Sequence, residues 1–226
     1  MEVDIRGVKV MLGMPLKDNM PKQTAFSLAK TMYECGSIGL DARYSIGSAS
    51  NNDRARDLVV DGFLESDSDK LFWLDSDMVW EPQDFFNILA FSTLVDVVLA
   101  SYPAKTEGPS PFFVDMENPT RSNELGLLKI KGAGLGFCCV DRKVVQEVAD
   151  MSPTVFDGSI GRKRKKIFRH DIKDGSDRTE DFAFFADIME CGYDIWLAPE
   201  IELGHIGSRE WRAKFADASN VTKTED

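Results

Sequence analysis

Short apolar runs alternate along the chain with segments whose apolar residues recur at helical spacing. The runs that indicate buried strands lie at residues 8–12, 42–46, 70–74 and 95–100. The helical stripes lie at residues 24–35, 53–65 and 81–91. This alternation is typical of βαβ units, so we expect an α/β fold with a mainly parallel central sheet flanked by helices.

The second half of the chain has a less regular pattern. It predicts strands at residues 126–130, 137–140 and 194–197, and helices at residues 142–151 and 180–191. Residues 153–176 are long, irregular and basic, as functional loops often are. We expect one domain at residues 1–215, with two halves that meet at about residue 102. A polar tail follows at residues 216–226.

Charge narrows the classes of function. The 226 residues are 43% hydrophobic, which suits a globular domain, and the formal net charge is −11. Such an acidic chain lacks the basic footprint that nucleic-acid-binding domains carry over a whole face. A local exception is the basic patch, which we define as residues 162–166 (R-K-R-K-K) together with Arg169.

The sequence also bears on compartment. No run approaches the roughly 20 apolar residues of a membrane span, and Glu2 and Asp4 stand where a signal peptide has basic residues. The four cysteines show no C-x-x-C spacing, which disfavours a zinc site and a disulfide framework; they are Cys35, Cys138, Cys139 and Cys191. We expect reduced, packed thiols in a cytoplasmic protein.

An acidic triplet, Asp75-Ser76-Asp77, directly follows the apolar strand at residues 70–74. Open α/β sheets bind ligands at the carboxyl ends of their strands. Two carboxylates this close repel each other unless a cation compensates them, and oxygen ligands suit Mg²⁺ or Mn²⁺. We therefore expect a site for a metal and a diphosphate, with a polar loop as the alternative.

Three further features carry candidate chemistry. His205, between two glycine-containing turns, could add a nitrogen ligand to the metal or could be a packed histidine. Glu180 and Asp181 open a helix, where the helix dipole favours acids, but one of them could act as a general base. Arg54 and Arg56 lie at a helix start and could contact phosphate or remain solvated.

A glycine-rich segment, G-A-G-L-G at residues 132–136, lacks the surroundings of a dinucleotide-binding fingerprint. Its glycines instead suggest a place where backbone amides approach a ligand closely.

These motifs, in this order, resemble those of the GT-A glycosyltransferases, and most closely the small single-domain members related to family 2 that occur in bacteriophage and large-virus genomes. They are Pro15 after the first strand, N-N-D-R-A-R at residues 51–56, L-F-W-L-D-S-D at 71–77, G-L-G-F at 134–137, T-E-D-F at 179–182, and W-L-A-P at 196–199 followed by His205. The resemblance spans the chain from residue 8 to about residue 211.

The resemblance implies a single Rossmann-like domain, with a nucleotide-sugar half at about residues 1–102 and an acceptor half at about residues 103–215. It also implies a hexosyl- or pentosyltransferase that uses a nucleoside diphosphate sugar, with UDP favoured. It implies that Mn²⁺ or Mg²⁺ is held by Asp75, Asp77 and His205, with Asp77 as a direct ligand and Asp75 contacting ribose or metal-bound water. The implied catalytic residues are Asp181, as the base, and Glu180. The implied donor-binding residues are Pro15, Asn51, Arg54, Arg56, Asp75, Ser76 and Gly134.

Two departures from the family pattern stand out. Asp57 follows Arg56 where related sequences often have Asn. The acidic pair that often reads uracil and ribose at the end of the second strand has no clear counterpart, and Asn51, Asn52 or Asp53 is expected in its place.

The acceptor stays open between a glycan and a hydroxymethylated pyrimidine in phage DNA, which the basic patch could contact. If the chain is viral, the compartment is the host cytoplasm. A nucleotidyltransferase is the alternative enzyme, although Gly13-Met14-Pro15-Leu16-Lys17 is a poor phosphate-gripping loop. An inactive module that binds sugar nucleotides is the third possibility.

Overall fold

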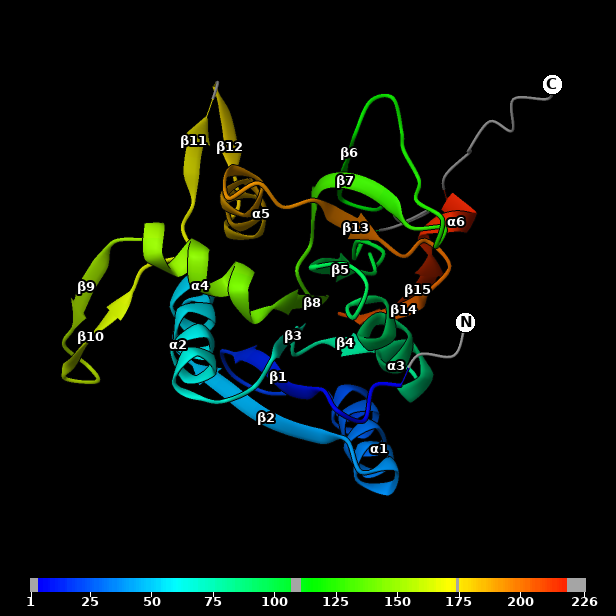
Figure 1. The fold of residues 1–226 in the computed structure, drawn as a ribbon, viewed down its shortest axis with the longest axis horizontal. Helices are drawn as coiled ribbons and strands as arrows, with labels where there is room; N and C mark the ends of the chain where they lie inside the picture. Colours follow the sequence, from blue (N-terminus) through cyan, green and yellow to red (C-terminus); the bar gives the residue numbers. More distant parts are fainter. Residues whose placement is uncertain (1–3, 107–110, 174, 219–226) are drawn as a thin grey trace.

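Helices cover both faces of an eight-stranded sheet in the computed structural model, which describes residues 4–106, 111–173 and 175–218 (Figure 1). The strands of the sheet are β1 (Lys9–Leu16), β2 (Asp41–Ser48), β3 (Lys70–Leu74), β5 (Val97–Leu99), β6 (Val114–Met116), β7 (Leu128–Ala133), β8 (Phe137–Asp141) and β13 (Ile195–Leu197). Their spatial order is β2-β1-β3-β8-β5-β13-β7-β6. The helices are α1 (Lys22–Ile38), α2 (Asn52–Glu65), α3 (Pro82–Phe91), α4 (Arg142–Met151), α5 (Glu180–Glu190) and α6 (Phe215–Ala218).

The sheet is mixed, so the α/β class is confirmed and the expectation of a mainly parallel sheet is met only in part. β1 is parallel to β2 and β3, and β13 is parallel to β5. β8 runs antiparallel between β3 and β5, and β7 is antiparallel to β13 and β6. Parallel neighbours need a long crossover connection, usually a helix. The described chain has no helix between β5 and β8, and it re-enters the sheet in the opposite direction.

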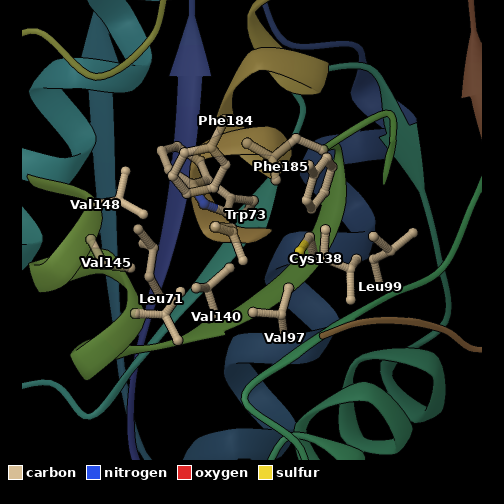
Figure 2. Packing of buried hydrophobic residues seen from close by; sticks show 14 of the residues in the cluster. Leu71, Trp73, Val97, Leu99, Cys138, Val140, Val145, Val148, Phe184 and Phe185 are labelled. Carbon is tan, nitrogen blue, oxygen red and sulfur yellow. The ribbon is translucent and has the colours of Figure 1, made fainter. Parts of the chain in front are cut away.

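The core follows the alternation of side chains along the strands. Leu71 and Trp73 of β3 and Cys138 of β8 face the layer formed by α2, α4 and α5 (Figure 2). Phe72 of β3 and Cys139 of β8 face the other layer, which includes α1 and α3. Cys35, Cys138 and Cys139 are buried, as expected of cysteines packed in a core, and Cys191 is partly buried.

Residues 153–176, expected to be irregular, contain two hairpins instead. β9 (Thr154–Asp157) pairs with β10 (Arg162–Lys165), and β11 (Asp171–Lys173) pairs with β12 (Ser176–Arg178). The two hairpins project beside α4 and α5 at one side of the molecule (Figure 1). Much of the basic patch therefore belongs to a strand, β10.

The first strand is also longer than the sequence pattern predicts. β1 continues through Pro15 to Leu16, and Pro15 lies opposite Gly47 of β2. Gly13 is therefore a strand residue. The polar tail expected at residues 216–226 begins within α6, and the rest of it lies outside the described residues.

A second, smaller sheet joins the strand end that carries the acidic triplet to the last part of the chain. It has the order β15-β14-β4, formed by β4 (Met78–Val79), β14 (Glu202–Ile206) and β15 (Glu210–Lys214). Among the described helices, none is long and apolar enough to cross a membrane.

Candidate functional site

Asp75, Ser76 and Asp77 form the link between β3 and β4, and the small sheet brings His205 beside them. β14 pairs with β4 in a register that places His205 opposite Met78, the residue after Asp77. The Ile206 backbone N–H donates to the Asp77 carbonyl oxygen at 2.8 Å. Two segments about 130 residues apart are thus fixed side by side by backbone pairing.

The Asp77 carboxylate and the His205 ring face each other. Nε2 of His205 lies 3.5 Å from Oδ1 of Asp77, while Nδ1 lies 2.9 Å from the Pro103 carbonyl oxygen. Because a carbonyl only accepts, Nδ1 carries a proton, and Nε2 is the ring nitrogen directed at Asp77. Burial opposes ionisation of Asp77, but hydrogen bonds from His205 and Lys105 outweigh it and hold the pKa of Asp77 below its ordinary value.

Arg56 bridges the acidic triplet and the start of α5. Its guanidinium Nη2 lies 3.0 Å from Oδ1 of Asp75 and 3.0 Å from Oδ1 of Asp181, and the side chain is only 1% exposed. The rings of Trp73 and Phe168 lie 5.5 and 5.8 Å from the guanidinium carbon. Burial disfavours the charge on Arg56, but Asp181 and Asp75 more than compensate and raise its pKa.

Asp181 is a buried carboxylate with an altered affinity for protons. Burial raises its pKa to about 6, although Arg56 opposes the change. Its Oδ2 accepts the backbone N–H of Leu135 at 3.0 Å, so the glycine-rich segment does supply an amide to the site. A carboxyl with this pKa is ionised at neutral pH and remains a better proton acceptor than an ordinary aspartate.

Tyr102 fills the space behind the acidic triplet. Its hydroxyl donates to Oδ2 of Asp75 at 3.3 Å and accepts the Gly136 N–H at 3.3 Å, and its ring packs edge-on against His205 at 4.8 Å between centroids. Burial raises the pKa of Tyr102 well above its ordinary value, so the hydroxyl remains a donor. A Cβ on Gly134 would collide with this hydroxyl, so a residue with a side chain does not fit at that position.

Two adjoining cavities meet at these residues. The first, about 310 Å³ in volume, has largely polar walls, formed by Pro15, Asn52, Arg56, Asp75, Ser76, Asp77, Tyr102, Glu180, Asp181 and His205. The second, about 420 Å³, has more apolar walls that include Phe113, Phe182 and Gly134. Tyr102, Asp181 and His205 line both, so we call them the polar cavity and the apolar cavity of one site.

Two of the expected donor-binding residues lie elsewhere. Asn51 caps α2, its side chain accepting the Arg54 backbone N–H at 3.2 Å. The Arg54 guanidinium turns to the β9–β10 hairpin and binds Asp157 at 2.7 and 3.1 Å. Arg54, expected to contact phosphate, is therefore not among the described residues that line the polar cavity, and its guanidinium is paired with an acid 103 residues away.

The basic patch is also largely neutralised within the fold. Arg164 is buried against Asp57 and Asp157, and Arg169 binds Asp187 at 2.6 and 2.8 Å. Arg162 contacts Asp61 and Glu65, and Lys166 lies near Asp53 and Asp57. These pairings leave little of the patch to serve as the phosphate-binding surface that the sequence suggested.

Glu180 lies at the rim of the polar cavity with both carboxylate oxygens engaged. Oε1 accepts the Asn52 side-chain N–H at 2.6 Å, and Oε2 lies 3.3 Å from Nε2 of His170. His170, Glu180 and Asp53 offer ligand atoms within 4.8 Å of one another. This group is separate from Asp77 and His205, and the sequence patterns did not single out His170.

Sequence reasoning also missed Tyr102 and Lys105. Both follow β5, which is parallel to β3 because each pairs antiparallel with β8. The carboxyl ends of parallel strands share one edge of the sheet, so residues just after β5 belong near those just after β3. That rule would have found both residues if the strand order had been known.

Comparisons by sequence give no family for the chain. No protein-family model matches it, and no curated protein matches it.

Solved structures do share its fold. The crystal structure of A197 from STIV is 20% identical, with a TM-score of 0.59 over 92% of this chain and 91% of that one. GalNAc-T7, solved with UDP, GalNAc and Mn²⁺, is 10% identical, with a TM-score of 0.53 over 88% of this chain and 44% of that one. The chain thus spans less than half the length of GalNAc-T7. At these identities the likeness shows a common fold, and it supports the GT-A fold that the motifs indicate.

Proposed function

We propose that this protein is a metal-dependent glycosyltransferase that moves a sugar from a nucleoside diphosphate sugar, with a UDP-sugar favoured, to a hydroxyl of a glycan. The observation that carries the proposal is the facing pair of Asp77 and His205, with Asp181 on the wall of the same polar cavity. GalNAc-T7, which shares the fold, was solved with UDP, GalNAc and Mn²⁺.

The residues present fit a divalent cation. A carboxylate oxygen and an imidazole nitrogen already face each other, and the carbonyl of Pro103 holds the ring in the orientation that ligating histidines adopt. Oxygen and nitrogen ligands of this kind suit Mn²⁺ or Mg²⁺. When bound, the cation supplies the Lewis-acid stabilisation that a departing diphosphate needs.

Asp75 has less freedom than Asp77 to bind a cation directly. Arg56 lies against its Oδ1 and Tyr102 against its Oδ2. These contacts favour the role in which Asp75 contacts the donor ribose or metal-bound water, and Asp77 and His205 are the direct ligands.

The chain's own residues then supply the remaining steps. Asp181 accepts the proton of the attacking hydroxyl, since it is ionised at neutral pH and borders both cavities. Arg56 fixes the spacing of Asp181 from the acidic triplet. Glu180, held by Asn52, orients the bound substrates at the rim.

The apolar cavity is the proposed acceptor site. Phe113 and Phe182 offer aromatic surface to the apolar face of a sugar ring, next to the base Asp181. A DNA acceptor would need free cations for its phosphates, and most of the basic patch is already paired with acids. We therefore favour a glycan over modified DNA.

A nucleotidyltransferase fits less well. Its phosphate-gripping glycine would lie in a loop after the first strand, but Gly13 lies inside β1 and packs against Val59 and Leu71. A glycosyltransferase releases a nucleoside diphosphate, whereas a nucleotidyltransferase releases pyrophosphate. An assay of the product therefore separates the two.

The experiment is a thermal-shift titration with UDP and Mn²⁺ on the wild type, Asp77→Asn, and the matched control Asp150→Asn on the outer face of α4. A ligand at about 100 times its Kd adds roughly 2.7 kcal/mol to stability. We expect a shift in the wild type and the control that EDTA abolishes, and none in Asp77→Asn. A shift that survives both EDTA and Asp77→Asn, or release of pyrophosphate from a nucleotide substrate, would refute the proposal.

A further inference from the structure

Lys105 contacts the carboxylate of Asp77, which is one of the proposed ligands of the divalent cation. Its ammonium contacts Oδ2 of Asp77, and Oδ1 of the same carboxylate faces His205. Both side chains are about a third exposed, 32% for Lys105 and 31% for Asp77. The carboxylate is thus paired with a cation of the protein itself, at a place open to solvent.

The backbone on either side of Lys105 is held in place. The Pro103 carbonyl accepts from His205, the Thr106 carbonyl accepts from Trp211 at 2.8 Å, and the Ala104 N–H donates to Pro111 at 2.9 Å. The four-carbon stem of the lysine is the flexible part. It runs past Gly207, where an added Cβ would lie 3.0 Å from Cδ of Lys105.

A diphosphate bound in the polar cavity needs cationic partners, and few are at hand. Arg56 is buried and committed to Asp75 and Asp181, and Arg54 is bound to Asp157. Lys105 is partly exposed on the wall of the apolar cavity. It reaches the polar cavity through Asp77, which lines that cavity and is the one acid that Lys105 contacts among the described residues. A divalent cation that took Asp77 would remove that partner and leave the ammonium beside the phosphates that the cation holds.

We propose that Lys105 competes with a divalent cation for Asp77 and, once the cation has displaced it, binds the diphosphate of the donor. This inference rests on the proposed function. It predicts that the metal and the nucleotide bind cooperatively. The cation releases Lys105 from Asp77, and the released ammonium binds the diphosphate; by linkage, the nucleotide then strengthens metal binding by the same factor.

The test measures binding rather than turnover. Mn²⁺ affinity without nucleotide is measured by calorimetry for the wild type, Lys105→Met and the control Lys131→Met. Lys131 lines a third cavity, about 410 Å³, that does not include Asp77, so its variant removes the same charge at another place. We expect Lys105→Met to bind Mn²⁺ about tenfold more tightly, the effect of losing one competing charge-assisted contact, and Lys131→Met to stay within about twofold.

The second measurement is UDP affinity at saturating Mn²⁺. Lys105→Met should bind UDP about tenfold more weakly than the wild type and Lys131→Met, because the ammonium that meets the diphosphate is gone.

The outcomes separate this inference from the proposed function. If Lys105→Met and Lys131→Met bind Mn²⁺ equally, Lys105 is no competitor and the inference is wrong. If UDP affinity is unchanged in Lys105→Met, the transfer of the ammonium to the diphosphate is wrong. If wild type and Asp77→Asn bind Mn²⁺ alike, the metal site fails, and the proposed function fails with it.

Discussion

Two clusters of charged side chains differ in how many of their polar atoms have hydrogen-bond partners. Each cluster contains one of two neighbouring residues of α2, Asp57 in the first and Arg56 in the second. The hairpin cluster consists of Asp57, Asp157 and Arg164. Asp57 is fully buried; its Oδ1 accepts the backbone N–H groups of Ile167 and Phe168 at 2.9 Å each, and its Oδ2 accepts from Arg164 at 2.5 Å. Each oxygen of this carboxylate has a partner, so the cluster ties the segment after β10 to α2.

The site cluster consists of Arg56, Asp75 and Asp181, and it is left partly unsatisfied. Nε and Nη1 of Arg56, Oδ1 of Asp75 and Oδ1 of Asp181 lack a hydrogen-bond partner among the described residues, although Nη2 of Arg56 lies near both acids. Buried polar groups without partners are rare and call for an explanation. Here all three side chains line the polar cavity, so the missing partners are those that a ligand can supply.

The comparison predicts its largest effect on stability at Asp57. Asp57→Ala removes one partner of a buried ion pair and two backbone hydrogen bonds, which should cost about 3–5 kcal/mol of unfolding free energy. Asp75→Ala, in the site cluster, should cost about 1 kcal/mol or less, since its side chain is partly exposed and poorly paired. Urea denaturation measures both, and equal losses would contradict the distinction between the clusters.

Two glycines extend the comparison to sterics. A Cβ on Gly47 of β2 would collide with the backbone carbonyl of Ala55 in α2, which cannot move without shifting the helix. A Cβ on Gly136 would lie 2.6 Å from Oδ2 of Asp75, a side-chain atom that can move. We expect Gly47→Ala to lose about 1–3 kcal/mol of stability. Gly136→Ala should lose much less stability but should weaken UDP binding in Mn²⁺.

Thermal unfolding and the UDP titration, run on both glycine variants, check this pair. Gly62→Ala is a suitable control, because its added Cβ would meet only Oγ of Ser45, at 3.5 Å. The prediction is contradicted if Gly136→Ala is as unstable as Gly47→Ala, or if it binds UDP normally. Either result would mean that the added Cβ does not act by displacing the carboxylate of Asp75.

The sequence predicts the helices and strands that carry the candidate site better than it predicts the directions of the strands in the sheet. Apolar periodicity locates β3, α2 and α5, and the acidic triplet at a strand end is a local pattern that needs no partner to be noticed. The direction of β8 has no such signature, because an apolar strand has the same pattern whichever way it runs. Its direction follows from the connection that precedes it, and that segment shows no periodicity.

The sequence also does not predict ion pairs between residues that are far apart in the chain. Arg54 had the position of a phosphate-binding residue, but its partner is Asp157 on a hairpin that the basic composition of residues 153–176 concealed. Asp57 looked like a departure from the family pattern, whereas its burial shows a structural role. Whether an arginine is free for a ligand depends on which acids the fold brings to it, and a single sequence does not contain that information.

The pH dependence of stability should have opposite signs in the two clusters. Hydrogen bonds from Arg54 and Arg164 hold the pKa of Asp157 far below its ordinary value. The folded state then binds fewer protons at this carboxyl than the unfolded state, so the stability it contributes is present above about pH 4 and is lost as the pH falls. Burial raises the pKa of Asp181 from 3.8 to about 6.

At Asp181 the folded state binds more protons than the unfolded state, so stability falls as the pH rises from about 4 to about 6. Unfolding free energies of the wild type, Asp157→Asn and Asp181→Asn, measured from pH 3 to pH 8, test this. The stability of the wild type relative to Asp157→Asn should fall toward low pH. Its stability relative to Asp181→Asn should fall toward high pH, because burial disfavours the ionised Asp181 but not the neutral Asn. Differences that change in the same direction would mean that Asp181, like Asp157, is a satisfied structural carboxylate, and its assignment as the base of the site would fall with that result.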